Sequence, residues 1–257
     1  MNNQPTKYQQ LNTDGVFALL NGELEKASRL FQQARDLRED CFEALCNLGK
    51  VELLKEHYHE AIALFQQSLE INDSFIESLH NLGVANYRLG ELEKAIEFYT
   101  KAVTIDPKYF QSAFNLGNCY YEKKELQKAI YWYQKAIEAN PAFFDAFFNL
   151  ANAYRENNQN SLAIQTFEEI VKKWPDVPMA YYNLGYSYHL EKNFQKAIEN
   201  YQKAIALRKN YLKAMINLAL IYEEQGEREK ALELLKQVQT IDPTIEVINF
   251  KIEQLKK

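Results

Sequence analysis

A recurring Asn-Leu-Gly or Asn-Leu-Ala triplet is the feature that most constrains this chain. Six copies follow one another at a constant spacing of 34 residues, beginning at Asn47, Asn81, Asn115, Asn149, Asn183 and Asn217. A second series keeps the same period, with an alanine followed four residues later by Phe31, Phe65, Tyr99, Tyr133, Phe167, Tyr201 or Leu235. Self-similarity at this period is typical of repeat architectures. The sequence therefore predicts seven tandem units, the first beginning at Tyr8.

Each unit has the pattern of two amphipathic helices joined by a short turn. In the third unit, Leu79 and Leu82 lie at helical spacing in one segment, and Ala95 and Tyr99 do so in the next. The sequence Leu-Gly-Glu around Gly90 predicts a tight turn between them. Because glycine and alanine are small, we expect them to let the two helices approach closely, with the aromatic side chain filling the space beside them.

Proline residues and one polar run indicate where helices end and where turns lie. Asp106-Pro107 predicts the end of a second helix, since a proline disfavours a helical conformation in the residue before it. The same stop recurs at Pro141, Pro175 and Pro243. The polar run of residues 156–161 is interpreted as a turn, because the 34-residue period passes through it undisturbed, and Ser161 is expected to cap the helix that follows.

These residues resemble the tetratricopeptide repeat family over nearly the whole chain. The resemblance implies an all-α fold, a right-handed superhelical solenoid of antiparallel helix pairs. It divides the chain into an N-terminal extension at residues 1–7, seven repeats at residues 8–245, and a C-terminal capping helix at residues 246–257. In that last helix, the side chains of Val247, Ile248, Ile252 and Leu255 are expected to cover the final unit. The tryptophan that often occurs early in the family's first helix is absent here.

Charge and cysteine content exclude several classes of protein. The formal net charge of -5 gives no basic field that would attract phosphates, so nucleic acid is not an expected partner. No segment approaches about 18 uninterrupted apolar residues, and residues 1–7 contain no apolar stretch, so no membrane association is expected. Three cysteines in a chain of this length favour reduced thiols in a cytosol. We therefore expect a soluble cytoplasmic protein.

No group of residues in the sequence predicts catalysis. His57-Tyr58-His59 lies at a turn without a neighbouring cysteine or carboxylate set, and it is interpreted as a solvated turn and not as a metal site. Cys41 and Cys46 lack the spacing of a redox pair and are interpreted as buried thiols. The sequence thus predicts no enzymatic activity, no metal and no cofactor.

A solenoid leaves one long surface, lined in this family mainly by the first helix of each pair, as a binding groove. Residues three and four positions apart in a helix share one face. The side chains that follow this spacing beside the leucines of the first helices should therefore form a stripe that faces this concave groove. The candidate peptide-binding residues are Asn81, Phe114, Asn115, Asn118, Tyr121, Phe148, Asn149, Asn152, Arg155, Tyr182, Asn183 and Tyr186. By contrast, Tyr120, Tyr154, Tyr188 and Tyr222 are assigned to the core.

The asparagine series has two interpretations, which the sequence leaves open. A primary amide offers donors and an acceptor, so a ladder of amides could pair with the backbone of an extended peptide. In this respect it is similar to the asparagine ladder in the repeat domain of O-linked N-acetylglucosamine transferases. The alternative is a structural role, because asparagine is common at this place in the family's repeats.

The family's two-carboxylate clamp, which uses lysines and an arginine to hold an acidic C-terminus, is absent. The place of its first lysine is occupied by Cys46, His80, Phe114, Phe148, Tyr182 and Ile216. Our first hypothesis is accordingly an interaction scaffold that binds an extended peptide or a helix of a partner protein. The alternatives are self-assembly into a homo-oligomer and a substrate-selecting partner of a separate transferase, the latter resting on analogy alone.

Overall fold

The structure of the protein is a computed structural model that describes residues 5–38 and 40–255. In this part of the chain it consists of helices and contains no strand. It divides into two compact units, unit 1 up to Ala142 and unit 2 from Phe143. Among the described residues, no helix is both long enough and apolar enough to cross a membrane.

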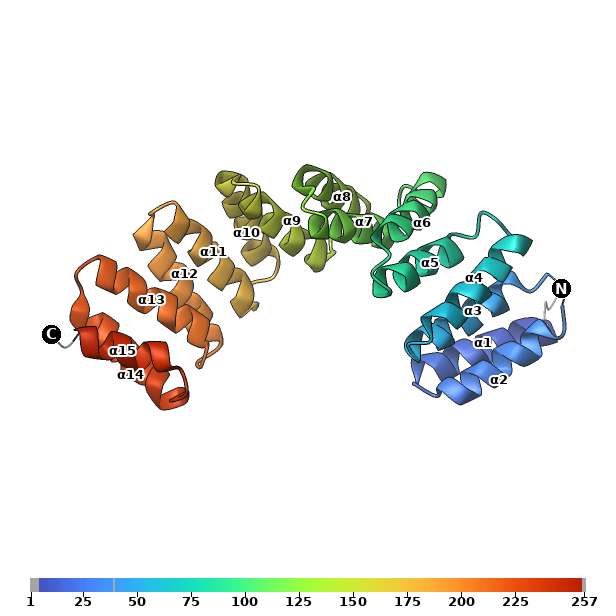
Figure 1. Ribbon diagram of the computed structural model, residues 1–257, viewed down its shortest axis with the longest axis horizontal. Helices are drawn as coiled ribbons and strands as arrows, with labels where there is room; N and C mark the ends of the chain where they lie inside the picture. Colours follow the sequence, from blue (N-terminus) through green and yellow to red (C-terminus); the bar gives the residue numbers. More distant parts are fainter. Residues whose placement is uncertain (1–4, 39, 256–257) are drawn as a thin grey trace. The chain divides into compact units, whose positions relative to one another are not determined.

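Unit 1 contains four helix pairs (Figure 1). In each pair a first helix is followed by a second helix, and within the unit helices that follow one another in the sequence pack together. The first helices are α1 (Lys7–Leu20), α3 (Phe42–Leu54), α5 (Ile76–Arg88) and α7 (Phe110–Glu122). The second helices are α2 (Leu24–Arg35), α4 (Tyr58–Ile71), α6 (Leu92–Ile105) and α8 (Leu126–Ala139).

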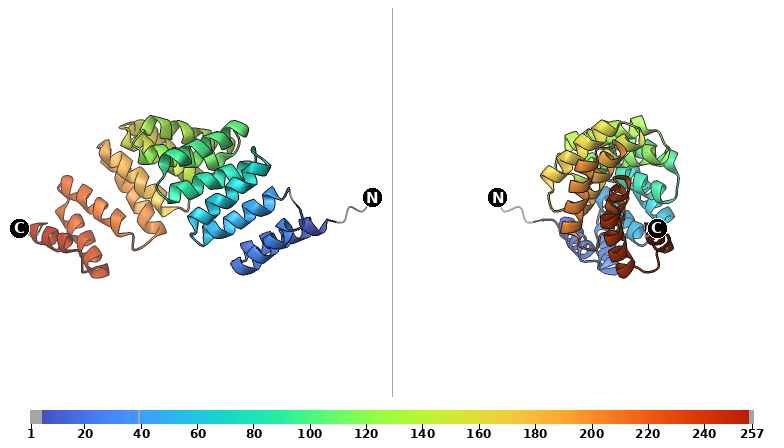
Figure 2. Two further views of the ribbon diagram at one scale, coloured as in Figure 1. Left: turned by 45° about the vertical axis from the view of Figure 1, so that its right-hand side comes forward. Right: turned by 90° about the vertical axis from the view of Figure 1, so that its left-hand side faces the viewer.

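Unit 2 contains three helix pairs and a final single helix, stacked in sequence order (Figure 2). Its first helices are α9 (Phe144–Glu156), α11 (Pro178–Leu190) and α13 (Leu212–Glu224). Its second helices are α10 (Asn160–Lys173), α12 (Phe194–Leu207) and α14 (Arg228–Ile241), and α15 (Glu246–Leu255) follows. The prediction of an all-α solenoid of antiparallel helix pairs is confirmed in both units.

Close approach of the paired helices depends on the small residues, as predicted. A Cβ atom added to Gly83 in α5 would lie 2.4 Å from Cε1 of Tyr99 in α6, far inside van der Waals contact. The Tyr99 ring is buried, and the same contact joins Gly15 to Phe31 and Gly49 to Phe65. The glycine therefore provides the space that the aromatic ring of the second helix fills.

The turn between the helices of a pair requires one residue in the left-handed conformation. Gly90 adopts φ 78°, and the following Glu91 N–H donates to the carbonyl of Asn86 at 2.9 Å, which closes the end of α5. The predicted turn is thus confirmed. The equivalent residues, all with positive φ, are Gly22, Glu56, Lys124, Asn158, Lys192 and Gly226. Four of the seven turns therefore place a side chain where glycine is favoured.

Helix ends confirm one prediction and correct another. Helix α6 ends at Ile105, and Asp106 before Pro107 is extended, as expected. The expectation that Ser161 caps α10 is wrong, because α10 begins at Asn160 after Gln159 and has no side-chain cap. Ser161 lies inside the first turn of the helix, where its hydroxyl cannot occupy the capping position.

Helix α15 packs on α14 through two isoleucines. Ile248 and Ile252 are buried, as expected, but Val247 is 73% exposed, so the expectation that it covers the last pair is wrong. Val247 follows Lys213 by one repeat, and Lys213 is exposed as well. The helical register turns this position outward in both helices. The last two residues of the predicted capping helix, Lys256 and Lys257, lie outside the described residues.

Candidate functional site

A stripe of partly exposed polar and aromatic side chains runs beside the buried leucines of the first helices. Leu116 in α7 and Leu150 in α9 are buried. We call the neighbouring stripe the first-helix face, and describe it separately in each unit. Eleven of the candidate binding residues are partly exposed, namely Asn81, Phe114, Asn115, Asn118, Tyr121, Phe148, Asn149, Asn152, Arg155, Tyr182 and Tyr186. Asn183 differs, because only 8% of it is exposed.

The aromatic residues before Asn115, Asn149 and Asn183 pack on the second helix of their own pair. Ring centroids lie 5.9 Å apart for Phe114 and Tyr133, 5.8 Å for Phe148 and Phe167, and 5.9 Å for Tyr182 and Tyr201. Such tilted and edge-on contacts hold an aromatic ring in one orientation. The three rings remain partly accessible, so they are fixed apolar surfaces on the first-helix face.

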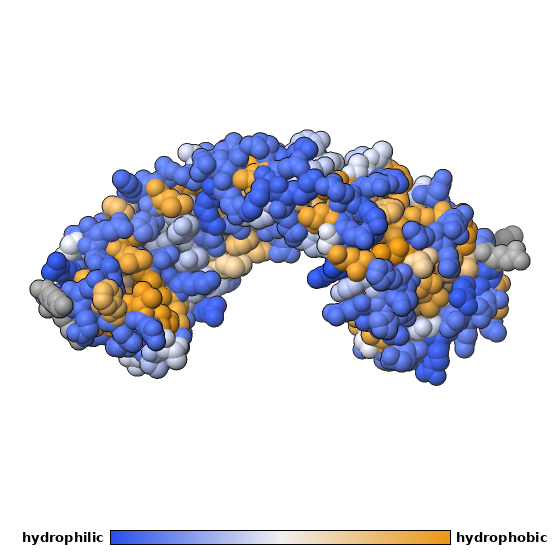
Figure 3. Space-filling model, in the orientation of Figure 1, coloured by the Kyte–Doolittle hydropathy of each residue, from blue (hydrophilic) through white to orange (hydrophobic). Residues whose placement is uncertain are grey.

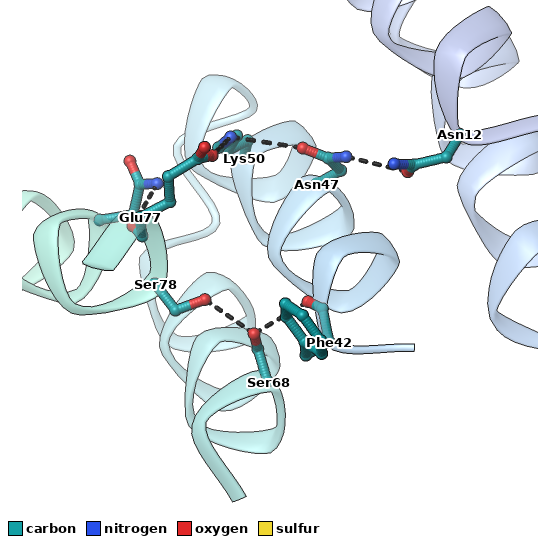
Figure 4. A network of polar contacts seen from close by, with 8 residues as sticks. Asn12, Phe42, Asn47, Lys50, Ser68, Glu77 and Ser78 are labelled. Carbon is teal, nitrogen blue, oxygen red and sulfur yellow. Dashed lines mark hydrogen bonds and ion pairs between the residues drawn. The ribbon is translucent and has the colours of Figure 1, made fainter. Parts of the chain in front are cut away.

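Asn47 is the centre of a polar network in unit 1 (Figure 4). Its amide donates to Oδ1 of Asn12 in α1 at 3.0 Å and accepts from Nζ of Lys50 at 3.3 Å. Lys50 also forms an ion pair with Glu77 in α5. The network links three successive first helices, which is a structural role for this asparagine.

Buried hydroxyls form a second network in the same region. Ser68 in α4 donates to the carbonyl of Phe42 at 2.8 Å, and Ser78 in α5 donates to the Ser68 hydroxyl at 2.8 Å (Figure 4). Both serines are buried, and their hydrogen bonds offset the desolvation of their hydroxyls. The network fixes α4 against the first helices on either side of it.

The aromatic residue of the preceding second helix differs between the asparagines, and so do the contacts of Asn81, Asn115, Asn183 and Asn217. Tyr99 and Tyr201 carry a hydroxyl, and Asn115 donates to the first at 3.2 Å and Asn217 to the second at 3.4 Å. Where the aromatic residue is phenylalanine, the amide turns to the carbonyl four residues earlier in its own helix. Asn81 donates in this way to Glu77 at 2.7 Å, and Asn183 to Met179 at 2.8 Å.

A primary amide has two N–H donors and an oxygen that accepts. The described contacts of Asn81 and Asn115 each use one N–H group. The amides of Asn81 and Asn115 are therefore anchored within the protein. Tyr99 and Tyr201, whose hydroxyls accept these hydrogen bonds, were not among the predicted site residues. The alternation of Tyr and Phe in the 34-residue series was the signal that could have identified them.

In unit 2 the first-helix face carries a cation held by amides and rings. Arg155 in α9 donates from one terminal nitrogen to Oδ1 of Asn152 at 2.8 Å and from the other to Oδ1 of Asn183 at 3.1 Å. Its Cζ atom lies 5.2 Å from the ring centroid of Tyr186 and 5.8 Å from that of Phe167. Four of the predicted site residues are thus brought together, including the buried Asn183.

Glutamates pair with other residues of the first-helix face. Tyr87 in α5 donates to Glu122 in α7, and burial together with this bond raises the pKa of the Tyr87 hydroxyl. In unit 2, Nε2 of His189 in α11 lies 3.5 Å from Oε1 of Glu224 in α13. In both cases a residue near the end of one first helix meets a glutamate 35 residues later, in the next.

The thiols and histidines do not form a reactive cluster in the described part of the chain. Cys41, Cys46 and Cys119 are buried, and burial raises the pKa of the Cys119 thiol to about 12, which opposes thiolate formation. His57 lies at the exposed turn before α4 beside Glu52, as expected of a solvated turn. Among the described residues, no three of His, Cys, Asp and Glu are grouped to hold a metal ion.

Of the tyrosines assigned to the core, Tyr154, Tyr188 and Tyr222 are buried, whereas Tyr120 is only partly buried.

Apolar areas interrupt the mostly hydrophilic surface of both units in the view of Figure 3. Two open cavities involve second helices and lie away from the candidate residues. One, of about 450 Å³, lies among α12, α13 and α14, and the other, of about 400 Å³, is lined mainly by α6 and α8.

The chain matches profiles of a single repeat family along most of its length. Profiles described as "Tetratricopeptide repeat" match residues 18–74, 76–109, 98–131, 145–176 and 176–244, and one described as "TPR repeat" matches residues 117–157. No curated protein matches the chain in sequence.

Solved structures of repeat proteins share the fold. YrrB, described as a TPR protein with an unusual peptide-binding site, is 23% identical with a TM-score of 0.64, over 74% of this chain and 97% of YrrB. MamA is 25% identical with a TM-score of 0.60, over 65% of this chain and 97% of MamA. The C-terminal part of a TPR repeat-containing protein from Cytophaga hutchinsonii is 18% identical with a TM-score of 0.79, over 92% of this chain and 97% of that one.

The profile matches agree with the helix pairs, with the 34-residue register and with the small-residue contacts between paired helices. Proteins built in this way stack their repeats and commonly present an extended surface to a protein partner. The chain belongs to the tetratricopeptide repeat family.

Proposed function

We propose that the protein is a non-catalytic interaction scaffold whose first-helix faces bind an extended or helical segment of a partner protein. The observation that supports this most directly is the set of aromatic rings that pack on the second helices and remain partly exposed. Rigid aromatic anchors are enriched among the residues that dominate binding energy at protein interfaces.

The neighbouring amides add hydrogen-bonding groups beside these anchors. Asn115 lies next to Phe114 in α7, and Asn149 lies next to Phe148 in α9. An amide can donate to a carbonyl and accept from an N–H of the same peptide backbone. Such pairs would hold a peptide segment with little dependence on its sequence, while the rings select apolar side chains.

The test compares partners captured from a cell lysate by the wild type and by two variants, quantified by mass spectrometry. The variant Phe114→Ala/Asn115→Ala alters unit 1, and Phe148→Ala/Asn149→Ala alters unit 2. The control is Tyr131→Ala/Asn200→Ala, which removes an exposed aromatic ring and an exposed amide from the second helices α8 and α12. Melting curves establish that each variant is folded before capture.

We expect at least one partner that the control retains and at least one variant loses. The affinities of that purified partner for the four proteins should then follow the same order as the amounts captured. A partner list that is identical for all four proteins would contradict the proposal. A partner lost only from the control would also contradict it and would favour the cavity that Tyr131 lines. Capture of the protein itself alone, with a mass that rises with concentration, would favour self-assembly instead.

A further inference from the structure

Arg155 is held in one orientation by its surroundings on unit 2. Its two terminal nitrogens donate to Asn152 at 2.8 Å and to Asn183 at 3.1 Å, and rings of Tyr186 and Phe167 lie within 5.8 Å of its Cζ atom. Asn183 is itself fixed, because its Nδ2 donates to the carbonyl of Met179. The guanidinium group is therefore preorganised, and little side-chain entropy remains to be lost when a ligand binds.

The positive charge of this group has no acidic partner among the residues that the structure describes. Both hydrogen bonds of Arg155 go to neutral amide oxygens, and no carboxylate of the described residues forms an ion pair with it. Two other arginines differ, since Arg35 pairs with Asp36 and Arg38 with Asp40. A guanidinium has five N–H donors, so three remain for another acceptor.

The repeat register shows which carboxylate is missing. Tyr87 donates to Glu122, and His189 lies beside Glu224, so in two places a residue of this stripe meets a glutamate 35 residues later. The residue 35 positions after Arg155 is Leu190, which is 46% exposed. The fold thus has a place for a carboxylate near this stripe, and in the repeat with the cation an apolar residue occupies it.

We propose that Arg155, together with the amide of Asn152, binds a carboxylate of the partner segment. A planar guanidinium and a carboxylate form paired, charge-assisted hydrogen bonds, which are stronger than bonds to neutral acceptors. This inference rests on the proposed function and adds to it the chemical class of the ligand, an acidic side chain or a free C-terminus.

The site differs from a two-carboxylate clamp, because one arginine supplies the charge and the remaining polar groups are amides of the same two first helices, α9 and α11. A structural role alone would leave the guanidinium charge without compensation in a partly buried position, which is unfavourable for folding. A bound carboxylate supplies that compensation.

The experiment uses an array of short random peptides, each synthesised with a free and with an amidated C-terminus. The full-length wild type is compared with Arg155→Gln, Leu190→Glu and the matched control Leu190→Gln. Leu190→Glu keeps Arg155 and its contacts, and it adds a carboxylate of the kind that Glu122 and Glu224 provide elsewhere. It therefore tests the site even if Arg155→Gln is poorly folded.

We expect the wild type to retain peptides with an acidic residue at one position, or peptides whose free C-terminus is required; the two arms separate these sources of carboxylate. Arg155→Gln and Leu190→Glu should each weaken binding of a retained acidic peptide about ten- to a hundredfold, and Leu190→Gln should not. Peptides retained without any preference for a carboxylate would overturn this inference and leave the proposed function standing.

An acidic preference that persists in both Arg155→Gln and Leu190→Glu would also overturn the assignment to Arg155. If the wild type retains no peptide above the background of an unrelated protein, the result contradicts the proposed function together with this inference. The three results are therefore distinguishable in one array.

Discussion

Replacing Gly117 by alanine tests the packing that joins the helices of a pair. The new Cβ would lie 2.4 Å from Cε1 and 2.5 Å from Cδ1 of Tyr133, so the ring would have to move by roughly 1 Å to restore van der Waals contact. Tyr133 is 1% exposed, and its hydroxyl donates to Oδ1 of Asn118 at 2.9 Å. The ring is therefore confined at both ends.

Two opposing effects determine the size of the change. Alanine favours a helix over glycine by about 1 kcal/mol. Overpacking a core typically costs about 1–3 kcal/mol, and the confinement of the ring places this contact in the upper part of that range. We expect Gly117→Ala to lower the free energy of unfolding by about 1–2 kcal/mol, despite its higher helix propensity.

A double-mutant cycle separates this clash from other effects. In the last pair, the buried Ala219 and Leu235 occupy the equivalent repeat positions, so Gly117→Ala/Tyr133→Leu reproduces a combination that the protein already contains. Urea unfolding followed by circular dichroism should show that the double variant loses at least about 1 kcal/mol less than the sum of the two single variants. A neutral or stabilising Gly117→Ala, or additive single changes, would refute the steric argument.

Three further predictions concern stability. Leu150→Ala should lower the free energy of unfolding by about 2–5 kcal/mol, because Leu150 is buried, whereas Asn149→Ala should change the melting temperature little. At the left-handed turn positions, Lys124→Gly should stabilise and Gly90→Ala should destabilise, each by up to about 1 kcal/mol in urea unfolding. Burial lowers the pKa of His80 from 6.5 to about 4, so the unfolded chain binds this proton at a higher pH than the folded chain does. The free energy of unfolding should therefore decrease as the pH falls from 6.5 to about 4. In His80→Phe this part of the decrease should be absent.

Most of the fold could be predicted from the 34-residue period. Once a glycine in one unit is placed against an aromatic ring, the same contact follows for the others, because each unit packs only on its neighbours. The two wrong expectations, for Ser161 and Val247, came from reading a residue type locally. The register places Ser161 two residues too late for a cap, since the N-cap residue Glu91 in the third unit corresponds to Gln159.

The contacts of the candidate site could be predicted only in part. Spacing identified Asn115 and Arg155 as residues of one helix face, because helical periodicity fixes which side chains share a stripe. It could not predict that Asn115 reaches the hydroxyl of Tyr99, because this depends on how far apart two helices of different pairs lie. Side-chain partners across helices are a property of the packed structure.

These contacts imply that the asparagines and Arg155 contribute differently to binding. At Asn115, a peptide that takes over the N–H now given to Tyr99 exchanges one neutral hydrogen bond for another, and such an exchange yields little net free energy. At Arg155, a carboxylate compensates a charge that has only amide partners, so the gain is not offset by a lost ion pair. The amides would then fix the direction and register of a bound segment, and the cation would select which segments bind.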